Sequence, residues 1–320
     1  MTYLKKQTLS LLSVALLCSC YGLGCGKKEQ GTATTAQPAG SVKLEGDVPS
    51  IHKKSMADTE IERNKKLLET NPSDAKIYNN LGLLYEEKGM FDESLAAYKK
   101  ASELNPALVE SLIGQGNILN KKGKADEALS IFKKAIEVDS HDAKAYEGLG
   151  LVYVHKSQLE EASNAFQKAI DLNPGLADSR YNLGILHAKK ARFDDAITEW
   201  TKAIEINPQK IEVYYNLGIA YTKVNKFDDA ISVWQKALTI RPDMEEFYYS
   251  IGLTYKEKGD FDKAEASLKK ALEVNPDTAD AHKVLEELYR SKGMIGEADR
   301  ESEMYKSKSS PHHSDPTGGH

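Results

Sequence analysis

A row of tyrosine and amide side chains recurs at a constant interval in the second half of the chain. Each tyrosine is followed directly by a short polar residue, in Tyr181-Asn182, Tyr215-Asn216 and Tyr249-Ser250, and Asn79-Asn80 is a related pair nearer the start. A primary amide can both donate and accept hydrogen bonds, so a row of amides can bind the backbone of an extended peptide. A tyrosine ring adds flat contact area with a polar tip. The pattern predicts an exposed peptide-binding surface. The alternative is that the tyrosines only pack against a neighbouring helix.

The interval of this row is 34 residues, and the whole chain shares it. Prolines recur at the same interval, at Pro72, Pro106, Pro174, Pro208, Pro242 and Pro276, and Ser140 takes the vacant place. A period of this size is typical of a repeat array, in which each unit packs only against its neighbours.

Each repeat is predicted to fold as two helices joined by a tight turn. In the unit from Ile211 to Arg241, the first half carries apolar residues at helical spacing, and the second half carries another apolar face. Asn225, between the halves, tolerates the positive φ that follows a helix end. Asp228 is predicted to be the N-cap of the second helix.

Small residues recur in the helix interiors opposite large ones. Gly218 is one of a series of mid-helix glycines, which cost about 1 kcal/mol each relative to alanine. We therefore expect another backbone to approach there too closely for a Cβ. One column of the second helices holds the large residues Tyr98, Phe132, Phe166, Trp200 and Trp234. Small against large predicts close packing within and between repeats.

These columns resemble the tetratricopeptide repeat. The residues that carry the resemblance in one unit are Tyr214, Leu217, Gly218, Tyr221, Ala230, Trp234, Ala237 and Pro242. The resemblance implies an all-α fold, a right-handed superhelical solenoid of antiparallel helix pairs. It places six full repeats and a capping repeat in residues 75–308, preceded by a capping helix in residues 57–74.

The resemblance also implies where a ligand binds. In this family the first helices line a concave groove, and members with a comparable asparagine ladder hold extended peptides there. The lysine-and-asparagine clamp with which some members hold a C-terminal carboxylate is absent from this sequence.

The N-terminus carries the pattern of an export signal. Residues 1–19 contain a basic pair followed by an apolar run that is shorter than the roughly 20 residues of a membrane span. Leu17 and Ser19 precede Cys20 as in a bacterial lipobox, which implies that Cys20 is diacylated and becomes the mature N-terminus. Cys25 is the poorer candidate, because a glycine takes the place of the aliphatic residue. The alternative is a plain secretory signal.

The segments outside the array have the composition of flexible chain. Residues 20–56 are predicted to be a tether and residues 309–320 a disordered tail. With a lipid anchor at Cys20, the repeats would face the periplasm of a bacterial envelope, on the outer rather than the inner membrane.

Composition and motifs exclude several function classes. The chain has a formal charge of −5 and no basic stripe, which argues against a nucleic-acid partner. It has no His-x-x-x-His pair, phosphate-binding glycine loop or nucleophile motif, so we expect no enzyme activity, no cofactor, no metal site and no small-molecule substrate.

Two functions remain open. The first is a membrane-anchored scaffold that binds an extended segment of a protein partner in its groove. The second is an assembly factor whose outer surface docks a folded subunit, like the repeat-containing lipoproteins that help pili or secretins assemble.

Overall fold

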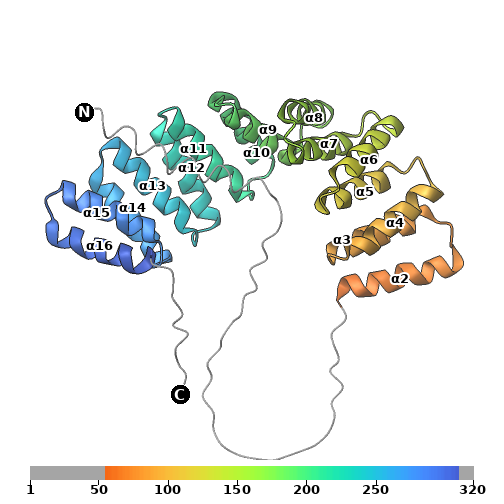
Figure 1. Ribbon diagram of the computed structural model, residues 1–320, viewed down its shortest axis with the longest axis horizontal. Coiled ribbons are helices and arrows are strands. Elements are labelled where there is room, and N and C mark those ends of the chain that lie inside the picture. Colours follow the sequence, from red (N-terminus) through yellow and green to blue (C-terminus); the bar gives the residue numbers. More distant parts are fainter. Residues whose placement is uncertain (1–54, 310–320) are drawn as a thin grey trace, which may run out of the picture. The chain divides into compact units, whose positions relative to one another are not determined.

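The computed structural model describes residues 55–309, which form fifteen α-helices and no strand (Figure 1). The predicted export signal, Cys20, nearly all of the tether and residues 310–320 lie outside the described residues. Two compact units divide between Lys156 and Ser157, and each is described by itself.

The first unit contains six described helices. They are α2 (Met56–Thr70), α3 (Ala75–Glu87), α4 (Phe91–Leu104), α5 (Val109–Lys121), α6 (Ala125–Val138) and α7 (Ala143–His155). The helix α2 lies in the region of the predicted capping helix. It starts with a capping box, in which Ser55 and Asp58 satisfy each other's backbone N–H groups.

The second unit contains nine described helices. They are α8 (Leu159–Leu172), α9 (Ala177–Lys189), α10 (Phe193–Ile206), α11 (Ile211–Lys223), α12 (Phe227–Ile240), α13 (Glu245–Lys258), α14 (Phe261–Val274), α15 (Ala279–Ser291) and α16 (Ile295–Ser309). Successive helices such as α9 and α10, or α13 and α14, pack along one another as antiparallel pairs. Within residues 55–309 no helix combines the length and the apolar character that crossing a membrane requires.

The turns inside the repeats confirm one expectation and contradict another. Asn225 has a φ of 60°, as predicted for the residue after the first helix. Asp228 is not the N-cap. The helix α12 already begins at Phe227, with Lys226 as its N-cap residue and no side-chain cap, so Asp228 lies inside the first turn. A carboxylate is favourable there because it faces the positive end of the helix dipole.

Asp228 instead belongs to a series of ion pairs that join consecutive repeats. A lysine at the end of a first helix reaches an acidic residue 30 positions earlier, in the first turn of the preceding second helix. The pairs are Lys88–Asp58, Lys122–Asp92 and Lys156–Asp126 in the first unit, and Lys190–Glu160, Lys258–Asp228 and Lys292–Asp262 in the second. Solvent-exposed ion pairs contribute up to about 1 kcal/mol each to stability. They therefore add to the stacking of the repeats, which depends mainly on the buried core.

Most of the mid-helix glycines face aromatic rings, so the expectation of a close backbone is wrong for Gly82, Gly116, Gly184 and Gly218. At Gly252 a Cβ would instead meet the Leu268 side chain at 2.8 Å and the Ala264 carbonyl at 3.3 Å. A Cβ on Gly116 would lie 2.7 Å from the Phe132 ring, and a Cβ on Gly218 would overlap the indole of Trp234. Phe132, Trp200 and Trp234 are at most 1% exposed. In these repeats the ring of the second helix therefore occupies the space that a side chain on the first helix would take.

Candidate peptide-binding surface

The three tyrosines of the predicted row lie at equivalent places in the second unit. Tyr181, Tyr215 and Tyr249 belong to α9, α11 and α13, the first helices of three consecutive repeats. Because they are separated by one repeat length each, the same turn of each helix presents one ring. The structure therefore places these three residues in one periodic strip.

The polar residues beside the tyrosines connect consecutive repeats. The amide Nδ2 of Asn216 donates to the Tyr181 hydroxyl at 3.0 Å, and Asn216 is only 5% exposed. In the next repeat, Ser250 donates to the Glu246 carbonyl at 2.7 Å, and it lies close enough to the Tyr215 hydroxyl to oppose the rise in pKa that burial causes there. The expectation of an exposed row is therefore wrong for Tyr181, Asn216 and Ser250, which are at most 9% exposed, because consecutive repeats pack over them. Tyr215 and Tyr249 are half-buried.

The series of tyrosine contacts changes at Tyr249. The residue that corresponds to Asn216 and Ser250 in the following repeat is Val284, which has no polar atom to offer. Burial raises the pKa of the Tyr249 hydroxyl, and the nearby carboxylates of Asp280 and Glu287 raise it further. The hydroxyl therefore stays a neutral donor at the end of the strip.

The remaining residues of the predicted site are more accessible. Asn182 is half-buried, and its amide donates to the Asp178 carbonyl one turn earlier at 2.9 Å, which leaves its Oδ1 as an acceptor. Asn79 and Asn80 belong to α3 in the other unit, where Asn80 is exposed and Asn79 is half-buried. This pair therefore belongs to a different unit from the tyrosine strip.

The sequence reasoning missed a buried ion pair beside the strip. Arg180 occupies the place where Tyr214 and Tyr248 stand in the following repeats, and it is 8% exposed. Its guanidinium lies 2.7 Å from Glu199 of α10, and its Nε donates to the Pro174 carbonyl. The sequence pattern that could have revealed this pair is a cation at a position that is aromatic in other repeats, followed 19 residues later by a glutamate. His282 and Glu301 repeat that spacing, with 2.6 Å between Nδ1 and Oε2.

A second missed feature lies on the face of Tyr181. The Lys210 ammonium is 4.9 Å from the centroid of the Tyr181 ring, and it also forms an ion pair with Asp178. A cation over an aromatic ring is attracted by the negative face of the π system.

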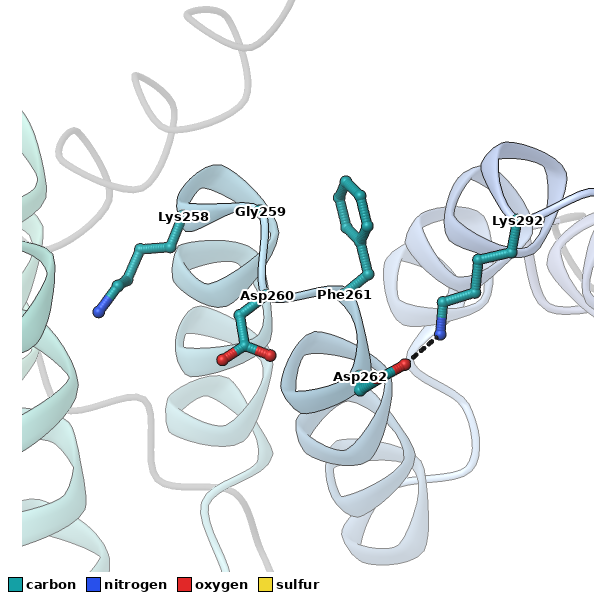
Figure 2. Close-up of a pocket in the computed structure, with 6 residues that line it drawn as sticks. All are labelled: Lys258, Gly259, Asp260, Phe261, Asp262 and Lys292. Atoms are coloured by element: carbon teal, nitrogen blue, oxygen red, sulfur yellow. Dashed lines mark hydrogen bonds and ion pairs between the residues drawn. The ribbon is translucent and has the colours of Figure 1, made fainter.

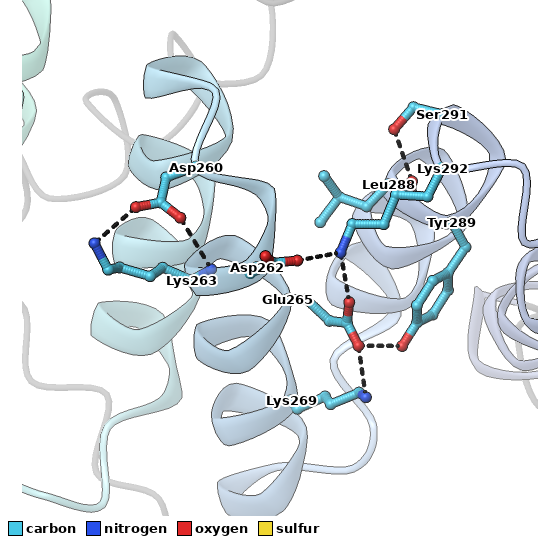
Figure 3. A network of polar contacts seen from close by, with 9 residues as sticks. All are labelled: Asp260, Asp262, Lys263, Glu265, Lys269, Leu288, Tyr289, Ser291 and Lys292. Atoms are coloured by element: carbon cyan, nitrogen blue, oxygen red, sulfur yellow. Dashed lines mark hydrogen bonds and ion pairs between the residues drawn. The ribbon is translucent and has the colours of Figure 1, made fainter.

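The charged groups at the turn between α13 and α14 are engaged with one another. Figure 2 shows a shallow pocket of about 490 Å³ lined by Lys258, Gly259, Asp260, Phe261, Asp262 and Lys292. In Figure 3, Glu265 accepts from Lys269, Tyr289 and Lys292, and Lys292 also bonds Asp262. The bond from Lys269, with the others, lowers the pKa of Glu265 to about 2. This network ties α14 to α15, so we assign it a structural role.

Comparison with known proteins agrees with the repeat pattern. Family models of the tetratricopeptide repeat match residues 75–108, 108–175 and 245–278, and the tetratricopeptide repeat protein 21 C-terminal ARM domain matches residues 152–251. None of the curated proteins matches the chain significantly.

Several solved structures of repeat proteins are similar to this chain. YrrB, described as a TPR protein with an unusual peptide-binding site, is 30% identical, with 59% of this chain and 97% of YrrB covered and a TM-score of 0.53. A repeat protein from Cytophaga hutchinsonii is 17% identical, with 72% and 95% covered and a TM-score of 0.62. Pseudomonas aeruginosa pilF is 17% identical, with 62% and 90% covered and a TM-score of 0.51. At this identity the last two show the fold alone.

Proposed function

The chain belongs to the tetratricopeptide repeat family, and from that premise we propose that it is a membrane-anchored scaffold that binds an extended segment of a protein partner. The fold is that of a protein–protein interaction scaffold. The observation that carries the finer proposal is the strip of Tyr181, Tyr215 and Tyr249, one per repeat on α9, α11 and α13. A periodic strip fits a ligand that is itself periodic, and an extended peptide backbone is such a ligand.

The contacts between repeats support this proposal. Asn216 fixes the Tyr181 hydroxyl, and Phe247 packs edge-on against Tyr215 with 6.0 Å between ring centroids. Rings held in this way lose little conformational entropy when a ligand binds, and such preorganisation favours affinity. The 30% identity with a protein described as having a peptide-binding site also favours this function.

Two single substitutions test the binding surface. Ten-residue peptides on an array identify binders, whose dissociation constants are then measured in solution by fluorescence anisotropy. We expect Asn182→Ala to weaken binding by about three- to tenfold, the loss of one hydrogen bond, with a change in unfolding free energy below about 0.5 kcal/mol. Asn216→Ala should instead lower the unfolding free energy by about 1 kcal/mol, because its amide bonds the neighbouring repeat.

The array also separates this function from its alternative. An assembly factor that docks a folded subunit on its outer surface would bind no short linear peptide, yet would retain its partner in the Asn182→Ala variant. That result would overturn the groove-binding proposal.

We propose that Cys20 carries the membrane anchor, on the strength of Leu17 and Ser19 before it. Acylation at Cys20 would hold the repeats on the periplasmic side of the outer membrane. Cys20→Ser should release the protein into the soluble fraction after cell lysis without detergent, and Cys25→Ser should leave it in the membrane fraction. The reverse result would move the anchor to Cys25.

A further inference from the structure

The contacts of Tyr181 show how this fold holds a cation beside a strip tyrosine. Asp178 lies in the first turn of α9, one turn before Tyr181, so both side chains share a face of the helix. Lys210, the N-cap residue of α11, places its ammonium 4.9 Å from the ring centroid and pairs with the Asp178 carboxylate. Ring, carboxylate and ammonium form a three-part contact.

Two of these three parts recur 68 residues later. Glu246 lies in the first turn of α13, one turn before Tyr249, as Asp178 does before Tyr181. The residue at the place of Lys210 is Thr278, the N-cap residue of α15, which is short and uncharged and donates to the Asn275 carbonyl. Within residues 55–309, no lysine or arginine lies over the Tyr249 ring or forms an ion pair with Glu246. The ring and the carboxylate are thus present without their cation.

The surroundings of Tyr249 favour a positive charge. Burial raises the pKa of the Tyr249 hydroxyl, and the negative charges of Asp280 and Glu287 raise it further. Burial raises the pKa of Glu246, and Glu245 beside it adds to the effect. Arg241 opposes that effect, but its guanidinium is bound to Asp243 at 2.9 Å. Lys256 is engaged with Glu287. A further cation would therefore lower the energy of this cluster.

The repeat between these two sites differs. Met244 stands at the place of Lys210 there, and Phe247 packs edge-on against Tyr215. Along the strip, Tyr181 therefore has a cation contact from the chain itself, Tyr215 has an apolar contact, and Tyr249 has no cation contact within residues 55–309.

We propose that Tyr249, Glu246 and Asp280 form a subsite for a lysine or arginine side chain of the bound segment, a specificity that rests on the proposed peptide-binding function. The partner segment is accordingly basic at the residue that meets α13. Its cation takes the place over the Tyr249 ring that Lys210 takes over the Tyr181 ring.

The test uses the chain's own pattern. A positional library of ten-residue peptides, with Arg, Glu, Ala or Leu at each position, is screened against the protein, and the strongest binder is labelled with fluorescein. Thr278→Lys places a lysine at the position that corresponds to Lys210, and its ammonium should occupy the subsite over the Tyr249 ring. We expect it to weaken binding of an arginine-containing peptide by about tenfold. Thr278→Gln, without the charge, should change affinity by less than about twofold.

A second variant protects the test against misfolding of Thr278→Lys. The Glu246 side chain is only partly buried and forms no ion pair within residues 55–309, so Glu246→Gln should keep the helix content and melting temperature of the wild type. It should weaken the arginine-containing peptide several-fold more than the same peptide with glutamine in place of arginine.

The outcomes distinguish this proposal from the function on which it rests. Peptides that bind without preference for arginine, or with equal affinity to Thr278→Lys and Thr278→Gln, would overturn the cation subsite and leave peptide binding intact. A library from which no peptide binds the wild type would overturn both.

Discussion

Replacing Gly218 by leucine should disrupt the packing of α11 against α12 and lower the unfolding free energy by about 3 kcal/mol. A single Cβ at this position already overlaps the indole of Trp234, which is 1% exposed. Three further carbons have no space unless the indole leaves its site, where its Nε1 also donates to the Tyr215 carbonyl. Overpacking of this kind commonly costs about 1–3 kcal/mol or more. Because Tyr215 belongs to the binding strip, the damage should reach that surface too.

Tryptophan fluorescence and thermal melting measure this effect. The chain has two tryptophans, so Trp200→Phe, which places the ring found at Phe166 in the preceding repeat, leaves Trp234 as the only reporter. Gly218→Leu in this background should shift emission to longer wavelength and lower the melting temperature. Gly296→Leu is the matched control, since a Cβ there meets nothing within 4 Å. Equal melting of the two leucine variants would show that the Trp234 ring does not require a glycine opposite it.

The sequence predicted the repeat fold because every unit solves the same packing problem with the same residue sizes. It predicted that the large residues pack against the small ones, but it placed a backbone rather than a ring opposite the mid-helix glycines. A small residue in a sequence indicates that a neighbouring group lies close to it, but it does not show whether that group is a backbone or a side chain. The last repeat agrees with this explanation. It has the small residue Ser302 at the position of the ring, and the opposite position is Glu286 instead of glycine.

The candidate site was predicted in part. The tyrosines were identified as a row because their spacing equals the repeat length. That Asn216 reaches Tyr181, 35 residues earlier, depends on how closely α9 and α11 approach, which the residue pattern does not specify. Lys210 was missed for a similar reason, because it lies in the turn before α11 and meets Tyr181 only after the repeats stack.

Arg180 was missed because a cation in an aromatic column looks like a departure from the repeat. Its partner Glu199 lies on the paired helix, and only folding brings them together. With 10% and 15% of their side chains exposed, the two charges depend on each other for compensation. Removal of either one should therefore have a large effect.

Glu199→Ala should lower the unfolding free energy by about 3–5 kcal/mol, because it leaves the Arg180 guanidinium buried without its carboxylate. Glu205→Ala is the matched control on the same helix, where the side chain is exposed, and it should change the unfolding free energy by less than about 0.5 kcal/mol. Urea unfolding followed by circular dichroism measures both.

A second substitution should restore the loss. Tyr214 stands at the place of Arg180 in the next repeat, and its hydroxyl donates to the Pro208 carbonyl at 3.0 Å, just as the Arg180 Nε donates to the Pro174 carbonyl at 3.2 Å. Tyrosine at position 180 can thus keep that hydrogen bond and needs no carboxylate. We expect Arg180→Tyr with Glu199→Ala to lie within about 1 kcal/mol of the wild type, because replacing both members of a buried pair by apolar groups is often neutral. If the double variant is as unstable as Glu199→Ala alone, the cost arises from the space that Glu199 fills and not from the uncompensated charge of Arg180.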